Sequence, residues 1–198
     1  MWEEQFFSNP WPYLIIDNFF DEQSFSYVND KVLARKKEYF QDKKRHMKVR
    51  DSGTYFHNVP DTFLHNYFSS NLTEDYLKSW FSTHRGYTNL HGEFDIKFSY
   101  KPHSWPIHDE VPEKVFSTVV YVAPQNNVGT IIFDKNKNFH GAVSWVPNRA
   151  VVFAGLSDIT WHCFGNWEKG NRITFDYFHC RQECDYHLPN VSSTMYNT

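Results

Sequence analysis

Cysteine is scarce in this chain: the 198 residues include three, Cys163, Cys180 and Cys184. A small, odd number argues against a disulfide scaffold and suits a reducing compartment. Long hydrophobic runs are absent too, because no stretch approaches the 18 or so apolar residues that span a bilayer. The opening Met1-Trp-Glu-Glu-Gln lacks the basic and then apolar order of a secretory signal. We therefore expect a soluble, cytoplasmic protein without a membrane partner, of a kind that a bacterium or a phage could encode.

The chain also lacks an excess of one charge sign, with 20 Lys and Arg against 23 Asp and Glu and a net charge of −3. Hydrophobic residues make up 40% of it and aromatic residues 19%. This composition excludes intrinsic disorder, collagen and coiled coil. The length corresponds to about one domain, and no repeat or low-complexity linker divides it. We expect a single domain over residues 1–198.

Positive charge is concentrated in one place, residues 31–50, which carry nine basic and two acidic side chains. This basic segment has a local charge of +7 beside an acidic remainder, so it could steer an anionic partner such as nucleic acid. Aromatic residues are not interleaved with the basic ones as single-strand binding would require. A solvated helix face and loop is the favoured interpretation, and nucleic acid is not the expected partner.

Helical signals occupy the first half of the chain. A short strand is predicted over residues 12–17, and Asp21 can cap a helix that follows it. Thr73 precedes two acidic residues suited to a first helical turn, and an apolar stripe follows them. Helical support is therefore expected over about residues 18–85. The apolar positions of the two predicted helices are Phe25, Val28 and Val32, and then Tyr76, Leu77, Trp80 and Phe81.

The hydrophobic period changes to two after Gly92. Phe94, Ile96, Phe98 and Tyr100 alternate with polar residues, which is the pattern of a strand with one buried face. Further strands are predicted at residues 114–123, 129–133, 141–146, 149–154 and 172–178. Helices followed by short, regularly spaced strands favour a mainly β fold with N-terminal helices. We expect a double-stranded β-helix (jelly roll, cupin-like), with its core at about residues 92–180.

Two histidines and one carboxylate in this β region are candidate metal ligands. Residues i and i+2 of a strand share a face, so His108 and Glu110 can point into one cavity, while Asp109 points away. His162 lies just after the strand at 149–154 and can return from an opposing strand. Two imidazoles and a carboxylate on one side of a metal form the facial triad typical of non-haem Fe(II) oxygenases.

A buried anion site is predicted ten residues beyond His162. Arg172 and Thr174 share a strand face. A guanidinium and a hydroxyl pointing inward would satisfy a carboxylate that would otherwise be buried at high cost. The implied ligand is a dicarboxylate or a keto acid.

The ordered set of these motifs resembles the Fe(II)/2-oxoglutarate-dependent dioxygenases of the prolyl 4-hydroxylase-like group. The similarity runs in the same order over residues 92–178, and residues 12–17 also resemble the entry strand of that group. The single motifs are weak, but their order and the spacing from His162 to Arg172 are specific. The motifs are His108-x-Glu110-x-Pro112-x-Lys114, Ser117-Thr-Val-Val-Tyr121, Gly129-Thr-Ile-Ile-Phe133, Asn148-Arg-Ala-Val-Val-Phe153, Trp161-His162 and Arg172-x-Thr174.

The resemblance implies an iron site and a cosubstrate site. His108, Glu110 and His162 would bind Fe(II), and Arg172 with Thr174 would bind the distal carboxylate of 2-oxoglutarate. Tyr121 and Tyr100 stand where the group often has a tyrosine near the cosubstrate. The implied reaction uses O2 to hydroxylate a C–H bond of an amino-acid or peptidyl, such as prolyl, substrate and releases succinate and CO2. The family's usual carboxylate is Asp, so Glu110 is a departure that leaves Asp109 as an alternative ligand.

Three other interpretations stay open. The chain could be a cupin-like binding protein that keeps the fold without turnover, or a nucleic-acid dealkylase of the same chemistry, for which the basic segment is the motivation. A separate zinc site is the third, because His179, Cys180, Cys184 and His187 form a His/Cys cluster. Its spacing does not match a common structural zinc motif.

Overall fold

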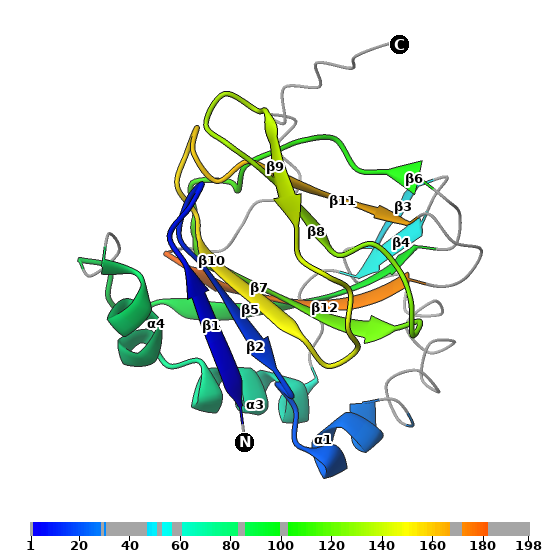
Figure 1. The fold of residues 1–198 in the computed structure, drawn as a ribbon. Helices are drawn as coiled ribbons and strands as arrows, with labels where there is room; N and C mark the ends of the chain where they lie inside the picture. The colour runs from blue at the N-terminus through cyan, green and yellow to red at the C-terminus, as the bar shows by residue number, and fades with distance from the viewer. Residues whose placement is uncertain are drawn as a thin grey trace.

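Two antiparallel sheets facing each other, with helices outside the larger one, make up the fold (Figure 1). The computed structural model describes residues 2–28, 30, 47–50, 53–56, 61–82, 86–99, 103–166 and 172–181, and for 47–50, 53–56 and 103–104 it describes the backbone alone. The helices in these ranges are α1 (Glu22–Tyr27), α3 (Thr62–Asn71) and α4 (Glu74–Trp80). None of the helices in this part of the chain has the length and apolar character needed to cross a bilayer.

The larger sheet has eight strands in the order β1-β2-β10-β7-β12-β5-β4-β3, and the smaller has four in the order β6-β11-β8-β9. Neighbours in both sheets are antiparallel and mostly non-consecutive in the chain, as a jelly roll requires. The mainly β, double-stranded β-helix prediction is therefore confirmed. The larger sheet comprises β1 (Glu3–Phe7), β2 (Tyr13–Asp17), β10 (Ala150–Ala154), β7 (Lys114–Ala123), β12 (Arg172–Cys180), β5 (His91–Ser99), β4 (Gly53–Phe56) and β3 (Met47–Arg50), and the smaller β6 (His103–Ser104), β11 (His162–Asn166), β8 (Thr130–Phe133) and β9 (Phe139–Ala142).

Side-chain caps begin the helices where the sequence predicts. The Asp21 carboxylate accepts a hydrogen bond from the Ser24 backbone N–H at 2.8 Å, and the Thr73 hydroxyl accepts one from Tyr76 N–H at 3.3 Å. Each cap satisfies a backbone donor that has no partner inside its helix. The predicted starts of α1 and α4 are thus confirmed.

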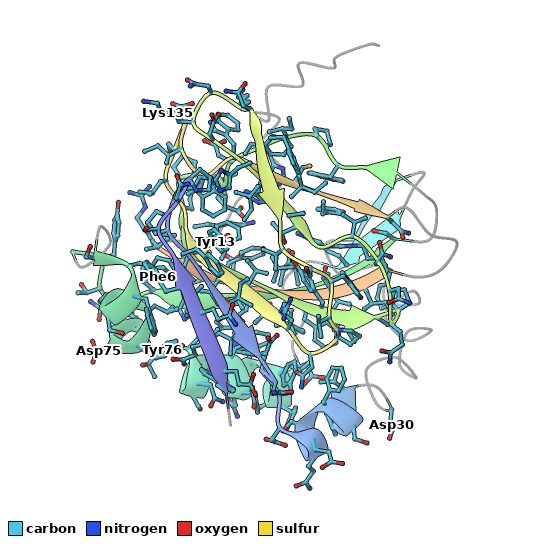
Figure 2. The ribbon with its side chains drawn as sticks, viewed as in Figure 1. Phe6, Tyr13, Asp30, Asp75, Tyr76 and Lys135 are labelled. Carbon is cyan, nitrogen blue, oxygen red and sulfur yellow. The ribbon has the colours of Figure 1, made fainter. Side chains whose placement is uncertain are left out.

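The main hydrophobic core lies between the helices and the outer face of the larger sheet. Phe68 of α3 is fully buried and stacks on Tyr177 of β12, with ring centroids 4.8 Å apart. Side chains crowd the interior around the labelled Tyr13 (Figure 2), which is 8% exposed. This core fixes α3 against β5 and β12 and leaves the inner face of the sheet for other groups.

On β5 that inner face is polar and buried, which differs from the prediction of one buried face for residues 94–100. Asp95 and Ser99 of β5 are 1% and 0% exposed. The reason is the second sheet, because the facing strands of a jelly roll cover the side of β5 that a single open sheet would leave to solvent. The polar residues of β5 and β12 therefore line the interior between the sheets.

Some elements depart from their predicted places. Strands β3 and β4 lie within the range expected to be helical, β1 was not predicted, and β9 covers residues 139–142 where 141–146 was predicted. Of the basic segment, residues 31–46 lie outside the described part of the chain, and residues 47–50 form β3.

Candidate metal centre

His108 and His162 lie directly opposite each other between two chain segments. They form an isolated antiparallel bridge in which the backbones exchange two hydrogen bonds, of 3.0 and 2.9 Å. Their ring centroids are 4.4 Å apart. His162 belongs to β11, and His108 lies on the segment that leads into β7. The backbone pairing therefore brings together two imidazoles that are 54 positions apart in the sequence.

Backbone carbonyls fix the tautomer of both rings. His108 Nδ1 lies 2.9 Å from the Pro106 carbonyl oxygen, and His162 Nδ1 lies 2.8 Å from that of Thr160. A carbonyl oxygen only accepts, so each Nδ1 carries the hydrogen and donates it. Each Nε2 consequently keeps a lone pair, which is the arrangement of a metal-binding histidine. Burial lowers the pKa of both imidazoles, and so favours the neutral form that binds metals.

Glu110 contributes a carboxylate to the same place. Its Oε1 lies 3.8 Å from His162 Nε2, and its Oε2 lies 3.1 Å from the Lys114 ammonium nitrogen. The Glu110 side chain is 8% exposed. Burial by itself raises the pKa of Glu110, but the neighbouring positive charge, that of Lys114 first, outweighs burial and holds the pKa below its usual range. Two neutral imidazoles and one anionic carboxylate thus lie in one region, a donor set of the type that suits a divalent transition metal, although their ligand atoms do not all come within 4.8 Å of one another.

Asp109, the alternative acidic ligand, is engaged elsewhere. Its carboxylate accepts a hydrogen bond from the backbone N–H of Asp158 at 2.8 Å. Glu110, and not Asp109, lies beside His162 and Lys114. The alternation of side chains along an extended segment accounts for this difference. His108 and Glu110, two positions apart, face one side, and Asp109 between them faces the other.

Arg172 is buried at the start of β12, with 1% of its surface exposed. Its guanidinium carbon lies 4.6 Å from the ring centroid of Phe164 and 5.0 Å from that of Trp145. Phe164 is two residues beyond His162 on β11, so one strand carries a candidate metal ligand and a wall of the arginine site. A buried guanidinium between aromatic rings is suited to binding a carboxylate.

Thr174 and Tyr121 are neighbours in the same wall. They pair across β12 and β7, and both are buried. The Tyr121 hydroxyl donates to Thr130 Oγ1 at 2.9 Å and accepts from Thr130 N–H at 2.7 Å. Its single hydrogen is therefore used within the protein, and its place near a cosubstrate stays a prediction. Tyr100, the other predicted tyrosine, lies outside the described residues.

Sequence reasoning missed two cationic side chains of this interior. Lys114 was left out of the site, yet it is the closest cation to Glu110 and also lies 3.4 Å over the Phe178 ring. Lys97 of β5 forms an ion pair with Asp176 of β12. The i,i+4 spacing of Glu110 and Lys114 in the sequence was a signal that could have identified Lys114. The sequence pattern placed Lys97 on the exposed face of a strand with one buried face, so no signal marked it.

Of the alternative His/Cys cluster, the structure describes His179 and Cys180. His179 and Cys180 are successive residues of β12, so their side chains point to opposite faces of the larger sheet. His179 packs on the helix side, where it meets Phe116 and Tyr177. Cys184 and His187 lie outside the described residues.

Comparison with known proteins finds similarity in structure. No protein-family model and no curated protein matches the sequence. An oxidoreductase of the 2OG-Fe(II) oxygenase family from Burkholderia pseudomallei is similar with a TM-score of 0.61 at 12% identity, over 86% of this chain and 84% of that one. A Pseudomonas putida prolyl-4-hydroxylase gives 0.58 at 13% identity, over 86% and 93%.

A third structure is a Trichoplax adhaerens prolyl hydroxylase in complex with a hypoxia inducible factor peptide fragment. Its TM-score is 0.57 at 12% identity, over 85% of this chain and 83% of that one. The fold is that of the 2-oxoglutarate–Fe(II) oxygenases. The resemblance to the prolyl 4-hydroxylase-like group, first seen in the motifs, is therefore confirmed at the level of the fold.

Proposed function

We propose that the protein is a 2-oxoglutarate-dependent Fe(II) dioxygenase that hydroxylates a C–H bond of an amino-acid or peptidyl substrate. One observation carries the proposal: both histidines donate Nδ1–H to backbone carbonyls beside an ionised carboxylate, which leaves two Nε2 lone pairs for a metal. The overall reaction converts substrate C–H, O2 and 2-oxoglutarate to substrate C–OH, succinate and CO2.

His108, Glu110 and His162 would hold the iron. Bound Fe(II) supplies the capacity to activate O2 for attack on an unactivated C–H bond. The chain's own contribution begins with Lys114, which binds one carboxylate oxygen of Glu110 and leaves the other beside His162. The Phe153 ring, 4.7 Å from that of His162, packs against the imidazole and excludes water from that side.

Arg172 and Thr174 would bind the distal carboxylate of 2-oxoglutarate. A guanidinium offers two parallel N–H donors to a carboxylate, and the Thr174 hydroxyl offers a third. We assign Tyr121 to the wall of this site, because its hydroxyl hydrogen is bound to Thr130 while its ring stacks on Trp145 at 4.5 Å. The phenol would have to give up that hydrogen bond to donate to the cosubstrate.

We assign the substrate to a cleft that Glu110 lines, while His108 and His162 are not among its lining residues. Its volume is about 240 Å³, and its lining includes Tyr87, Pro112, Leu156 and Arg181. A mixed apolar and cationic lining is compatible with a peptide backbone and a small apolar side chain. The peptide held by the similar Trichoplax adhaerens enzyme also favours a peptidyl substrate.

The test is release of succinate and CO2 from 2-oxoglutarate by the full chain with Fe(II), O2 and a panel of amino acids and proline-containing peptides. We expect release that a member of the panel stimulates and that His108→Ala and His162→Ala abolish. A folded wild type that binds neither Fe(II) nor 2-oxoglutarate would overturn the proposal. Binding of both with no turnover on any substrate, nucleobases included, would favour the non-catalytic cupin-like alternative.

A further inference from the structure

A second group of potential metal ligands lies on the inner face of the larger sheet, where β5 begins and β12 ends. Its members are His91 and Glu93 of β5 and Cys180 of β12. His91 and Glu93 are two residues apart on one strand and therefore share a face. Cys180 is the direct cross-strand partner of His91. Side chains paired in this way start about 5 Å apart at their Cβ atoms, close enough to share one ion.

The ligand atoms of the three residues converge. One atom from each, an imidazole nitrogen, a carboxylate oxygen and the thiol sulfur, lies within 4.8 Å of the other two. His91 Nε2 and Glu93 Oε1 are 3.2 Å apart. Ligand bonds of 2.0–2.3 Å around a tetrahedral zinc ion place neighbouring ligand atoms roughly 3–4 Å apart. A small closure of the thiol toward the other two would complete the set.

Burial separates this cluster from an ordinary surface group. Cys180 is 0% exposed and Glu93 is 3% exposed, while the His91 side chain is 38% exposed. A buried carboxylate and a buried thiol beside an imidazole are a donor set that a divalent cation can bind. The exposed edge of His91 provides an entry path and a fourth position for water.

We propose that His91, Glu93 and Cys180 form a second metal site, which binds Zn²⁺. Thiolate and imidazole ligands select zinc, whereas the His108, Glu110 and His162 set has no sulfur. The two sets share no residue, so this proposal stands independently of the proposed oxygenase function. The backbone of Lys114 pairs with that of Cys180. Its ammonium group, however, forms an ion pair with Glu110, which belongs to the other set of ligands.

The test is titration of the metal-stripped full chain with Zn²⁺ and with Co²⁺, which reports thiolate ligation by a sulfur-to-cobalt charge-transfer absorption. We expect this absorption in the wild type and in His162→Ala, where the other set is incomplete. Cys180→Ser should abolish it. His91→Ala should weaken Zn²⁺ binding by more than about tenfold, because even loss of an outer partner of a metal ligand costs that much.

Cys163→Ser is the matched control, since Cys163 is also buried but lies on β11 away from this cluster. It should keep the charge-transfer absorption. Circular dichroism checks that each variant is folded, and His91→Ala carries the test if Cys180→Ser fails to fold. The proposal is overturned if the folded wild type gives no such absorption, or if the absorption survives in Cys180→Ser or Zn²⁺ affinity is unchanged in His91→Ala. Succinate release, measured in the same preparations, reports on the oxygenase proposal separately.

Discussion

Glu110 keeps its charge inside the protein because Lys114 binds it, and this pair offers a test at the scale of single residues. Lys114→Met would leave a buried carboxylate without its cation. Loss of one partner of a buried ion pair costs about 3 kcal/mol or more. We expect that loss in urea unfolding of the metal-free variant. Added Mn²⁺ should recover part of it, because a divalent ion at the proposed site supplies the missing positive charge.

Lys78→Met is the control for this experiment. Lys78 and Glu74 form an ion pair with the same i,i+4 spacing and a 2.8 Å separation, but on helix α4 with more exposed side chains. Such a pair contributes about 0.5 kcal/mol or less. An equal loss of stability with and without Mn²⁺ in Lys114→Met would show that Glu110 does not face a metal.

The two adjacent acids should respond differently to substitution. Glu110→Asp shortens the side chain by one methylene and draws the carboxylate away from Lys114 and His162. We expect Fe(II) affinity to fall by about tenfold, the lower end of losses for perturbed ligand shells. Asp109→Ala removes one hydrogen bond to Asp158, so it should cost about 1 kcal/mol of stability and leave Fe(II) binding intact. Isothermal titration decides, and the reverse ranking would make Asp109 the ligand.

At the scale of elements, the residue that follows β10 packs closely against the start of β7, and this close packing depends on a glycine. A Cβ at position 155 would lie 2.3 Å from the Lys114 carbonyl oxygen and 3.6 Å from the Glu110 Cβ. Gly155→Ala must therefore push the start of β7 and shift Glu110. We expect a loss of roughly 1–3 kcal/mol in urea unfolding, as for other overpacked sites, together with weaker Fe(II) binding.

Gly141→Ala on β9 provides the comparison, since a Cβ there meets nothing within 4 Å. Its unfolding free energy should stay within about 0.5 kcal/mol of the wild type. If both alanine variants behave alike, the close approach of Gly155 to Lys114 has no energetic consequence.

The sequence predicted those elements whose signals are local. Asp21 and Thr73 mark helix starts because the cap lies within three residues of the donor it satisfies. Strand β1 could not be found this way. Its residues are largely exposed at the sheet edge, so they lack the alternation that marks a half-buried strand. The burial of Asp95 was equally hidden, because it depends on a facing sheet that no local pattern describes.

The candidate residues could be selected from the sequence, but their surroundings could not. His108, Glu110, His162 and Arg172 could be selected because residue type and ordered spacing carry their chemistry. The contacts of Tyr121 with Thr130 and of Arg172 with Phe164 depend on which strands of the two sheets meet. Which strands lie next to each other is set by the topology of the fold, which local sequence patterns do not reveal. The same reason explains why Cys180 meets His91 rather than His179.

At the scale of the whole molecule, the proposed ligands would join the two sheets. His162 lies in the smaller sheet and Arg172 in the larger, so a metal and 2-oxoglutarate bound together would connect them. A ligand that binds only the folded state stabilises it by RT ln(1 + [L]/Kd), about 2.7 kcal/mol at a concentration of one hundred times Kd. For a chain of this size that corresponds to a rise in Tm of roughly 5–10 °C.

Thermal unfolding with Mn²⁺, with and without 2-oxoglutarate, would separate the two contributions. We expect the wild type to gain from Mn²⁺ and to gain again from 2-oxoglutarate. Arg172→Leu should keep the first increment and lose the second, because it removes the guanidinium without altering His108, Glu110 or His162. His162→Ala should lose the first and reduce the second. If Arg172→Leu retained the full 2-oxoglutarate increment, the carboxylate would bind elsewhere, and the two sheets would be joined by the metal alone.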